Sequence, residues 1–161
     1  MENSTSGISR RYSPTEAFPA ICRYCAYQER SHQEVRDKLY SYGLHKGDVE
    51  EILSRLITEG FLNEERFAKA FAGGKFRIKK WGRRKITHEL EAHHITPKCI
   101  EKGLKEIDEN DYRKSLKDIL KKKLAQVVDT NQFKKNDKVA RFAIAKGYEP
   151  ELVWQFLKEG V

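Results

Sequence analysis

One pattern of residues occurs three times in this chain of 161 residues. The copies begin at Glu34, Lys85 and Lys138, which lie 51 and 53 positions apart. Aligned in this register, the apolar positions coincide in four sets: Val35, Ile86 and Val139; Leu44, Ile95 and Tyr148; Val49, Ile100 and Val153; Leu53, Leu104 and Leu157. A period of this length is typical of arrays of small units that bury their apolar faces on one another. Such an array presents a long surface, which favours a binding protein over an enzyme with a pocket.

Helix signals cover the first repeat. Ser13 precedes Pro14 and Glu16, and Ser31 precedes Glu34, so each serine begins a capping box. The third segment matches the helical spacing at five positions: Val49, Ile52, Leu53, Leu56 and Ile57. Glycines at 43 and 60 end the second and third segments. The first repeat is therefore predicted to contain three helices.

The second and third repeats follow the same plan. Asn63 begins a helix whose predicted inward stripe is Phe67, Ala70, Phe71, Gly74 and Ile78. Gly82 breaks that helix, Pro97 starts another, and Gly147 separates the last pair. No segment alternates with period two as a strand would. We predict an all-α chain of about nine helices: a disordered tail (1–13) and three tandem three-helix repeats (14–62, 63–107 and 108–161).

The charge of the chain is unevenly distributed. Lys and Arg exceed Asp and Glu by eight overall; residues 1–62 carry a net charge of −1 and residues 63–161 a net charge of +9. An excess of this sign favours an acidic partner, of which nucleic acid is the commonest. The second and third repeats are therefore expected to form the binding surface.

The densest basic segment is KFRIKKWGRRK, residues 75–85, which contains no acidic residue. Its candidate DNA- or filament-binding residues are Lys75, Arg77, Lys79, Lys80, Trp81, Arg83, Arg84 and Lys85. If the helix keeps its phase through Ile78, Phe76 points outward among these cations, where it can stack on a base. The alternative is a solvated charged face, with Phe76 packed on a neighbouring repeat. Trp81 can likewise serve as a packing anchor or as a stacking platform.

A second basic run extends from Arg113 to Lys123. Within it Lys114, Lys117 and Lys121 lie along one helical face. Further along the chain, Lys135 and Arg141 add positive charge near the last pair of helices. Part of this charge can serve solubility alone. Whether the three groups converge on one surface is left open by the sequence.

Other chemical patterns are weak. Cys22 and Cys25 have the spacing of a CxxC site, but both fall on an apolar helical stripe, where cysteine acts as a small hydrophobic residue. His88 and His93 lie about 140° apart on a helix, which is poor geometry for a shared metal. No phosphate-binding loop, dinucleotide-binding turn, nucleophile elbow or HExxH pair occurs. We therefore expect no enzyme, metal or cofactor.

Three groups of residues along the chain resemble the pattern of a known family. The resemblance rests on Arg30-Ser31 with Glu34 and Leu39, on Phe61-Leu62-Asn63 with Arg66-Phe67-Ala68, and on Trp81-Gly82 with Lys85-Ile86 and Glu89-Leu90. In this order the sequence, from about Thr15 to Lys158, resembles the RecX regulators of the RecA recombinase. Two positions depart from the family pattern: Asn63 replaces an aspartate, and His94 replaces a glycine, so that a left-handed backbone is expected at a histidine.

The resemblance implies a fold and a function. Its fold is a curved, elongated stack of three three-helix repeats. Its function is to bind the RecA filament on single-stranded DNA and to inhibit filament extension, ATPase and co-protease activities. From the sequence itself we expect a monomer in the cytoplasm. The polar N-terminus and the lack of a long apolar run agree with that compartment. Two alternatives remain: a general DNA-binding protein built from helix-turn-helix-like units, and a protein-only adaptor whose charge serves solubility.

Overall fold

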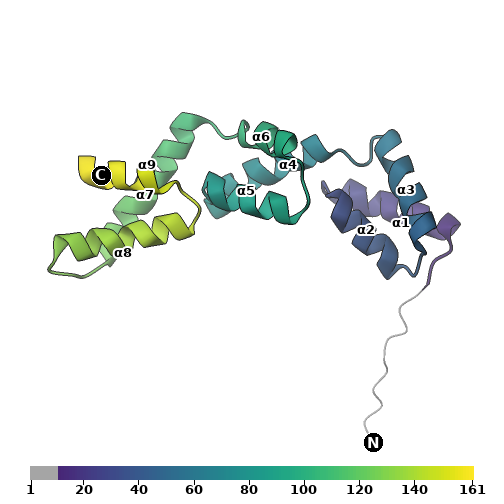
Figure 1. The fold of residues 1–161 in the computed structure, drawn as a ribbon, viewed down its shortest axis with the longest axis horizontal. Coiled ribbons are helices and arrows are strands. Elements are labelled where there is room, and N and C mark those ends of the chain that lie inside the picture. Colours follow the sequence, from purple (N-terminus) through teal and green to yellow (C-terminus); the bar gives the residue numbers. More distant parts are fainter. Residues whose placement is uncertain (1–10) are drawn as a thin grey trace, which may run out of the picture. The chain divides into compact units, whose positions relative to one another are not determined.

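The structure, a computed structural model, describes residues 11–161, and within this range the chain forms α-helices and no strand (Figure 1). Residues 1–10 of the expected tail lie outside the described range. The nine α-helices of residues 11–161 are α1 (Pro14–Tyr27), α2 (His32–Ser41), α3 (Lys46–Thr58), α4 (Glu64–Gly74), α5 (Arg83–Ala92), α6 (Pro97–Leu104), α7 (Glu109–Gln126), α8 (Gln132–Ala145) and α9 (Pro150–Glu159). A π-helical turn, η1 (Lys75–Lys79), follows α4. The predicted all-α fold of tandem three-helix repeats is confirmed.

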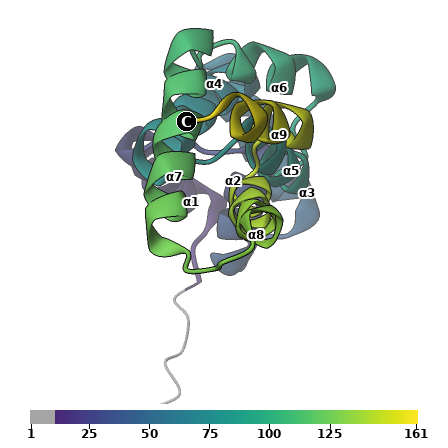
Figure 2. The same ribbon diagram turned by 90° about the vertical axis from the view of Figure 1, so that its left-hand side faces the viewer.

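The chain divides into two compact units, with the boundary after Phe67. In unit 1 the helices α1, α2 and α3 pack on one another. In unit 2 the helix α5 packs on α6, and α7, α8 and α9 pack together; Figures 1 and 2 both show α8 beside α7. From Ala68 onward, the second repeat thus belongs with the third to one compact unit.

Unit 1 is built around a single apolar core. Ile21 on α1, Val35 and Leu39 on α2, and Val49 and Leu56 on α3 are fully or almost fully buried. Both predicted capping boxes are present: the Ser13 hydroxyl accepts a hydrogen bond from the Glu16 amide, and the Ser31 hydroxyl accepts one from the Glu34 amide. These caps satisfy amides that have no partner within the helix and so fix where α1 and α2 begin.

Unit 2 depends on a close approach of two backbone segments. The Gly82 amide donates to the Lys146 carbonyl at 2.8 Å, and the Arg84 amide donates to the Gly147 carbonyl at 2.9 Å. A Cβ atom added at Gly82 would lie 2.2 Å from the Gly147 carbonyl carbon, so no other residue fits there without movement. Gly147 also has a φ of 103°, which favours glycine. Main-chain contact therefore ties the start of α5 to the turn before α9.

The turn η1 overturns one expectation from the sequence. Ile78 was expected to point inward and Phe76 outward, but Phe76 is 8% exposed and Ile78 is 79% exposed. A π-helical turn closes its hydrogen bonds over five residues instead of four, and the Lys80 amide donates to the Lys75 carbonyl. The extra residue shifts Ile78 away from the predicted stripe. That stripe is also wrong within α4, because Ala68 and Ala72 are fully buried and Ala70 is exposed. The buried Phe76 continues the observed face at a spacing of four residues.

Candidate nucleic-acid interface

In the middle of the basic segment, Lys80 has a left-handed backbone conformation that contacts from the third repeat hold in place. Lys80 has a φ of 58°, which places a non-glycine residue in the left-handed region. The Tyr148 hydroxyl donates a hydrogen bond to the Lys80 carbonyl at 3.0 Å, and the Lys146 ammonium lies 3.4 Å from the Lys79 carbonyl. Residues of the third repeat thus fix the carbonyls at the end of η1. The direction of the Lys80 side chain is set by tertiary contacts and not by helix geometry alone.

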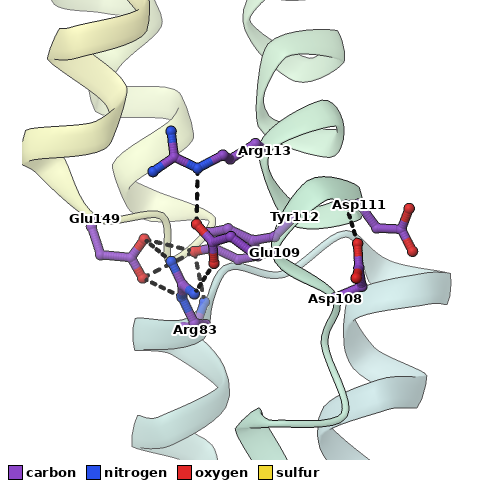
Figure 3. A network of polar contacts seen from close by, with 7 residues as sticks. All are labelled: Arg83, Asp108, Glu109, Asp111, Tyr112, Arg113 and Glu149. Atoms are coloured by element: carbon purple, nitrogen blue, oxygen red, sulfur yellow. Dashed lines mark hydrogen bonds and ion pairs between the residues drawn. The ribbon is translucent and has the colours of Figure 1, made fainter.

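Arg83 lies at the centre of a polar network (Figure 3). Its guanidinium donates to both Glu149 oxygens at 3.0 and 3.3 Å and to Glu109 at 2.8 Å. The guanidinium also lies 3.9 Å from the centre of the Tyr112 ring. The Tyr112 hydroxyl lies 3.0 Å from Glu149 and accepts a hydrogen bond from the Arg83 amide at 3.1 Å. The network joins the start of α5 to both α7 and the turn before α9.

This network changes the protonation of its members. Burial disfavours the charge of Arg83, but the hydrogen bonds that it donates to Glu149 and Glu109 outweigh this effect and raise the arginine's pKa. The hydrogen bond from Arg83 lowers the pKa of Glu109. Burial raises the pKa of Tyr112, so its hydroxyl stays protonated. Arg83, which the sequence placed among the DNA-binding residues, is therefore engaged by two carboxylates within the fold.

An open groove of about 680 Å³ lies beside this network, between η1 and the helices α7 and α8. Three apolar side chains, Phe76, Ile119 and Phe142, contribute to its lining. Six cationic residues and two acidic ones also line it: Arg77, Lys80, Lys114, Lys122, Lys123, Lys146, Asp111 and Asp118. The groove thus combines an excess of positive charge with apolar contact area. That combination suits a phosphate backbone with attached bases.

The predicted site residues divide between this groove and other places. Arg77, Lys80 and Lys114 line the groove. Phe76 lines it too but is buried against Tyr112, with ring centres 5.9 Å apart. Of the two roles that the sequence left open for Phe76, packing on a neighbouring repeat is the one found. Its expected outward position is wrong for the reason given for η1.

The other predicted cations lie outside the groove. Lys75 and Lys85 flank the half-buried Trp81 ring, with ammonium groups 5.0 and 4.5 Å from its centre. Lys117 lies 4.9 Å from the Phe156 ring, and Arg141 forms an ion pair with Asp137 at 3.0 Å. The remaining four are absent from the groove lining: Lys79, Arg84 and Lys121 are exposed, and Lys135 is half-buried. The three basic groups of the sequence therefore converge only in part.

Nine residues that line the groove were not among the predicted site residues, and four of them are cationic or aromatic: Lys122, Lys123, Phe142 and Lys146. Lys122 and Lys123 belong to the basic run of α7, but the face predicted to bind was the neighbouring one, with Lys114, Lys117 and Lys121. A stripe at Ser115, Ile119, Lys122 and Gln126 would have identified the correct face, because these positions lie at helical spacing. Phe142 and Lys146, four residues apart on α8 and its C-cap, carry no signal by themselves. Only the packing of α7 on α8 assigns them to the groove.

The cysteines lie where the apolar stripe of α1 placed them. Cys25 is buried in the core of unit 1, and burial raises its thiol pKa to about 11. Burial also raises the pKa of Cys22.

Among residues 11–161, no three His, Cys, Asp or Glu side chains gather as metal ligands would. No helix in that same range has the length and apolar character needed to cross a bilayer.

Comparison with known proteins gives matches along most of the chain. A family model described as the first three-helix domain of RecX matches residues 17–56, and one described as the second three-helix domain matches residues 63–104. Together the two models cover more than half of the sequence.

Curated relatives carry the name "Regulatory protein RecX". The protein of Prosthecochloris aestuarii is 28% identical over 136 residues, which are 84% of this chain and 87% of the relative. The protein of Clostridium botulinum (strain Eklund 17B / Type B) is 27% identical over 134 residues, or 82% of this chain. The chain spans 62% of that relative and 61% of the one from Clostridium beijerinckii, about three-fifths of their length.

Two crystal structures share the fold. RecX from Lactobacillus salivarius superposes with a TM-score of 0.81 at 20% identity, covering 91% of this chain and 95% of that one. A second structure, described as regulatory protein RecX, gives a TM-score of 0.82 at 18% identity, covering 91% of this chain and 72% of that one.

Proposed function

The chain belongs to the RecX family, and on that premise we propose that it is a non-enzymatic regulator that binds the RecA filament on single-stranded DNA. Bound there, it inhibits filament extension and the ATPase and co-protease activities of the recombinase. This regulation acts on recombination, DNA repair and the SOS response in the cytoplasm. The observation that supports the proposal is the cationic groove of unit 2, with six basic residues and an apolar part to its lining.

The groove suits contact without sequence readout. Lysine and arginine ammonium and guanidinium groups bind phosphate oxygens at any base sequence. A filament regulator needs this property, because a recombinase filament forms on DNA of any sequence. Asp111 and Asp118, which also line the groove, disfavour phosphate beside them and restrict where a strand can pass. Arg83 does not line the groove and instead joins the start of α5 to α7 and to the turn before α9.

The test is the single-stranded-DNA-dependent ATPase of the cognate recombinase. We compare the wild type with a groove variant that carries Arg77→Glu, Lys80→Glu, Lys114→Glu and Lys122→Glu. A control variant has the same charge change at four exposed lysines outside the groove: Lys46, Lys98, Lys105 and Lys158. Wild type and control should inhibit equally, and the groove variant should need at least about tenfold more protein for half-inhibition.

Three other results would contradict parts of the proposal. If the wild type leaves ATP turnover unchanged, the recombinase is not the partner. If the groove variant inhibits as well as the control variant does, the groove takes no part. If the groove variant loses a salt-sensitive affinity for naked DNA while inhibition is unaffected, the chain is a general DNA-binding protein instead.

A further inference from the structure

Unit 1 carries a surface that the proposed function does not use. Four tyrosines and two cations follow one another through direct contacts, in the order Tyr27, Arg30, Tyr24, Lys38, Tyr42 and Tyr12. We call this set the tyrosine array. It is formed by the end of α1, the end of α2 and the segment before α1. The near-neutral charge of residues 1–62 gave no sign of it in the sequence.

The contacts within the array are close. The Arg30 guanidinium lies 3.8 Å from the centre of the Tyr24 ring and 5.9 Å from that of Tyr27. The Lys38 ammonium lies 5.3 Å from the Tyr24 ring centre and 5.8 Å from that of Tyr42. The rings of Tyr42 and Tyr12 are 4.6 Å apart. Rings and cations therefore alternate along most of the array.

The array is open to solvent at several points. Tyr27 is 83% exposed, which is unusual for so large a ring, while Tyr12, Tyr24 and Tyr42 are half-buried. Arg30 is largely buried and donates a hydrogen bond to the Tyr24 carbonyl, so it holds the end of α1 in place. Lys38 is half-buried, and the exposed Arg23 adds charge beside Tyr42. The cations open to a ligand are thus Lys38 and Arg23.

The acidic residues near the array are engaged locally. Glu34 accepts a hydrogen bond from the Ser31 amide and lies 3.8 Å from the Arg30 guanidinium. Asp37 accepts a hydrogen bond from the Gln33 amide group at 2.9 Å. Glu29 accepts one from Arg66. Part of the negative charge around the array is therefore compensated within unit 1.

We propose that the tyrosine array binds a single-stranded polynucleotide, with bases stacked on the tyrosine rings and phosphates beside Lys38 and Arg23. Alternating rings and cations suit the alternating bases and phosphates of one strand. Any base can stack on an aromatic ring, so the contact does not depend on the nucleotide sequence. A duplex offers its bases only as edges in the grooves, so it cannot stack on these rings. The array is independent of the groove of unit 2 and of any recombinase. It gives the protein a second point of contact with DNA.

The test uses the full chain with the four groove substitutions described above, so that the groove cannot account for binding. A labelled oligodeoxythymidylate is titrated by fluorescence anisotropy. Tyr27→Ala should weaken binding by about tenfold, within the range expected for the loss of one base–ring stack. Tyr40→Ala is the matched control, because Tyr40 is also an exposed tyrosine (44%) and its ring takes no part in the ring–ring and ring–cation contacts that define the array. It should leave binding unchanged.

A second pair of variants tests the charge. Lys38→Gln should reduce the slope of log affinity against log salt by about 0.7, the value for one phosphate contact on a single strand, and Lys46→Gln should not. An oligonucleotide containing 5-iododeoxyuridine should photo-crosslink to Tyr27 or Tyr24. The inference is overturned if the groove-substituted chain binds no oligonucleotide, or if Tyr27→Ala and Tyr40→Ala bind alike. It is also overturned if Tyr27→Ala weakens binding to DNA-free recombinase alone, since the array would then dock a protein.

These outcomes separate the inference from the proposed function. Because the oligonucleotide affinities are measured without recombinase and without the groove charges, failure of the ATPase test leaves them unaffected. Conversely, loss of the array contact leaves the comparison between groove and control variants intact.

Discussion

At the scale of single residues, Gly82 places the strictest steric demand on unit 2. Gly82→Ala should lower the free energy of unfolding by about 1–3 kcal/mol or more, because its Cβ would overlap backbone atoms of Gly147 that have no room to move. Gly74→Ala is the control: Gly74 has helical backbone angles, and nothing lies within 4 Å of its added Cβ. That substitution should be neutral or stabilising by up to about 1 kcal/mol. Urea unfolding of both variants measures the difference, and equal destabilisation would contradict the close approach.

Lys80 and His94 both have left-handed backbone conformations, but only that of His94 was predicted from the sequence. His94 was expected to adopt a left-handed conformation because it stands where the resembling family has glycine, and its φ is 60°. Lys80 has nearly the same φ, yet nothing in its neighbourhood predicted this. Its conformation depends on Tyr148, 68 positions away, whose hydroxyl binds the Lys80 carbonyl. Local sequence therefore predicts the conformation of His94 but not that of Lys80.

At the scale of elements, Phe76 and Ile78 in η1 have the opposite exposures from those expected: Phe76 is buried and Ile78 is exposed. Phe76→Ala should cost about 3–5 kcal/mol, the usual range for removing a buried phenylalanine, because its ring packs on Tyr112. Ile78→Lys should change stability by less than about 0.5 kcal/mol, since that side chain is 79% exposed. Thermal unfolding of the two variants provides the measurement. The opposite order of stabilities would contradict the burial of Phe76 and the exposure of Ile78.

The helices themselves were predictable, and η1 was not. Ser13, Ser31 and Asn63 begin helices through side-chain caps that depend only on residues three positions away. Gly43, Gly60 and Gly147 have positive φ where the sequence expected helices to end. The π-helical turn instead lies where Phe76 packs on Tyr112, an apolar contact made by a residue of another repeat. For the same reason the groove could be predicted only in part: Arg77, Lys80 and Lys114 were found from local charge, whereas Phe142 and Lys146 belong to it through helix packing.

The network around Arg83 predicts a pH dependence of stability. Arg83 lowers the pKa of Glu109 in the folded state, so the ionised carboxylate stabilises the fold above the unfolded-state pKa of about 4.5. This contribution is lost as the pH falls through the lower, folded-state pKa. Glu109→Gln should therefore be less stable than the wild type at neutral pH, by less than about 1 kcal/mol because the pair is partly exposed. Urea midpoints of the two proteins should converge in acid; a constant difference at every pH would contradict the ion pair.

At the scale of the whole molecule, the two units each have a core of their own. Leu39 in unit 1 and Leu116 in unit 2 are both fully buried, so each change to alanine should cost about 2–5 kcal/mol. Both tryptophans, Trp81 and Trp154, belong to unit 2. Leu116→Ala should therefore shift the unfolding curve followed by tryptophan fluorescence, and Leu39→Ala should shift mainly the curve followed by circular dichroism. Identical shifts by both probes would show that the units unfold as one.

The main-chain hydrogen bonds of Gly82 and Arg84 also supply a natural reporter. Their amide protons are bound by carbonyls of residues 146 and 147, more than sixty positions away. Each proton can exchange with solvent deuterium only when the second and third repeats separate. Their exchange rates consequently measure how often the start of α5 separates from the turn before α9, with no label attached and no side chain changed.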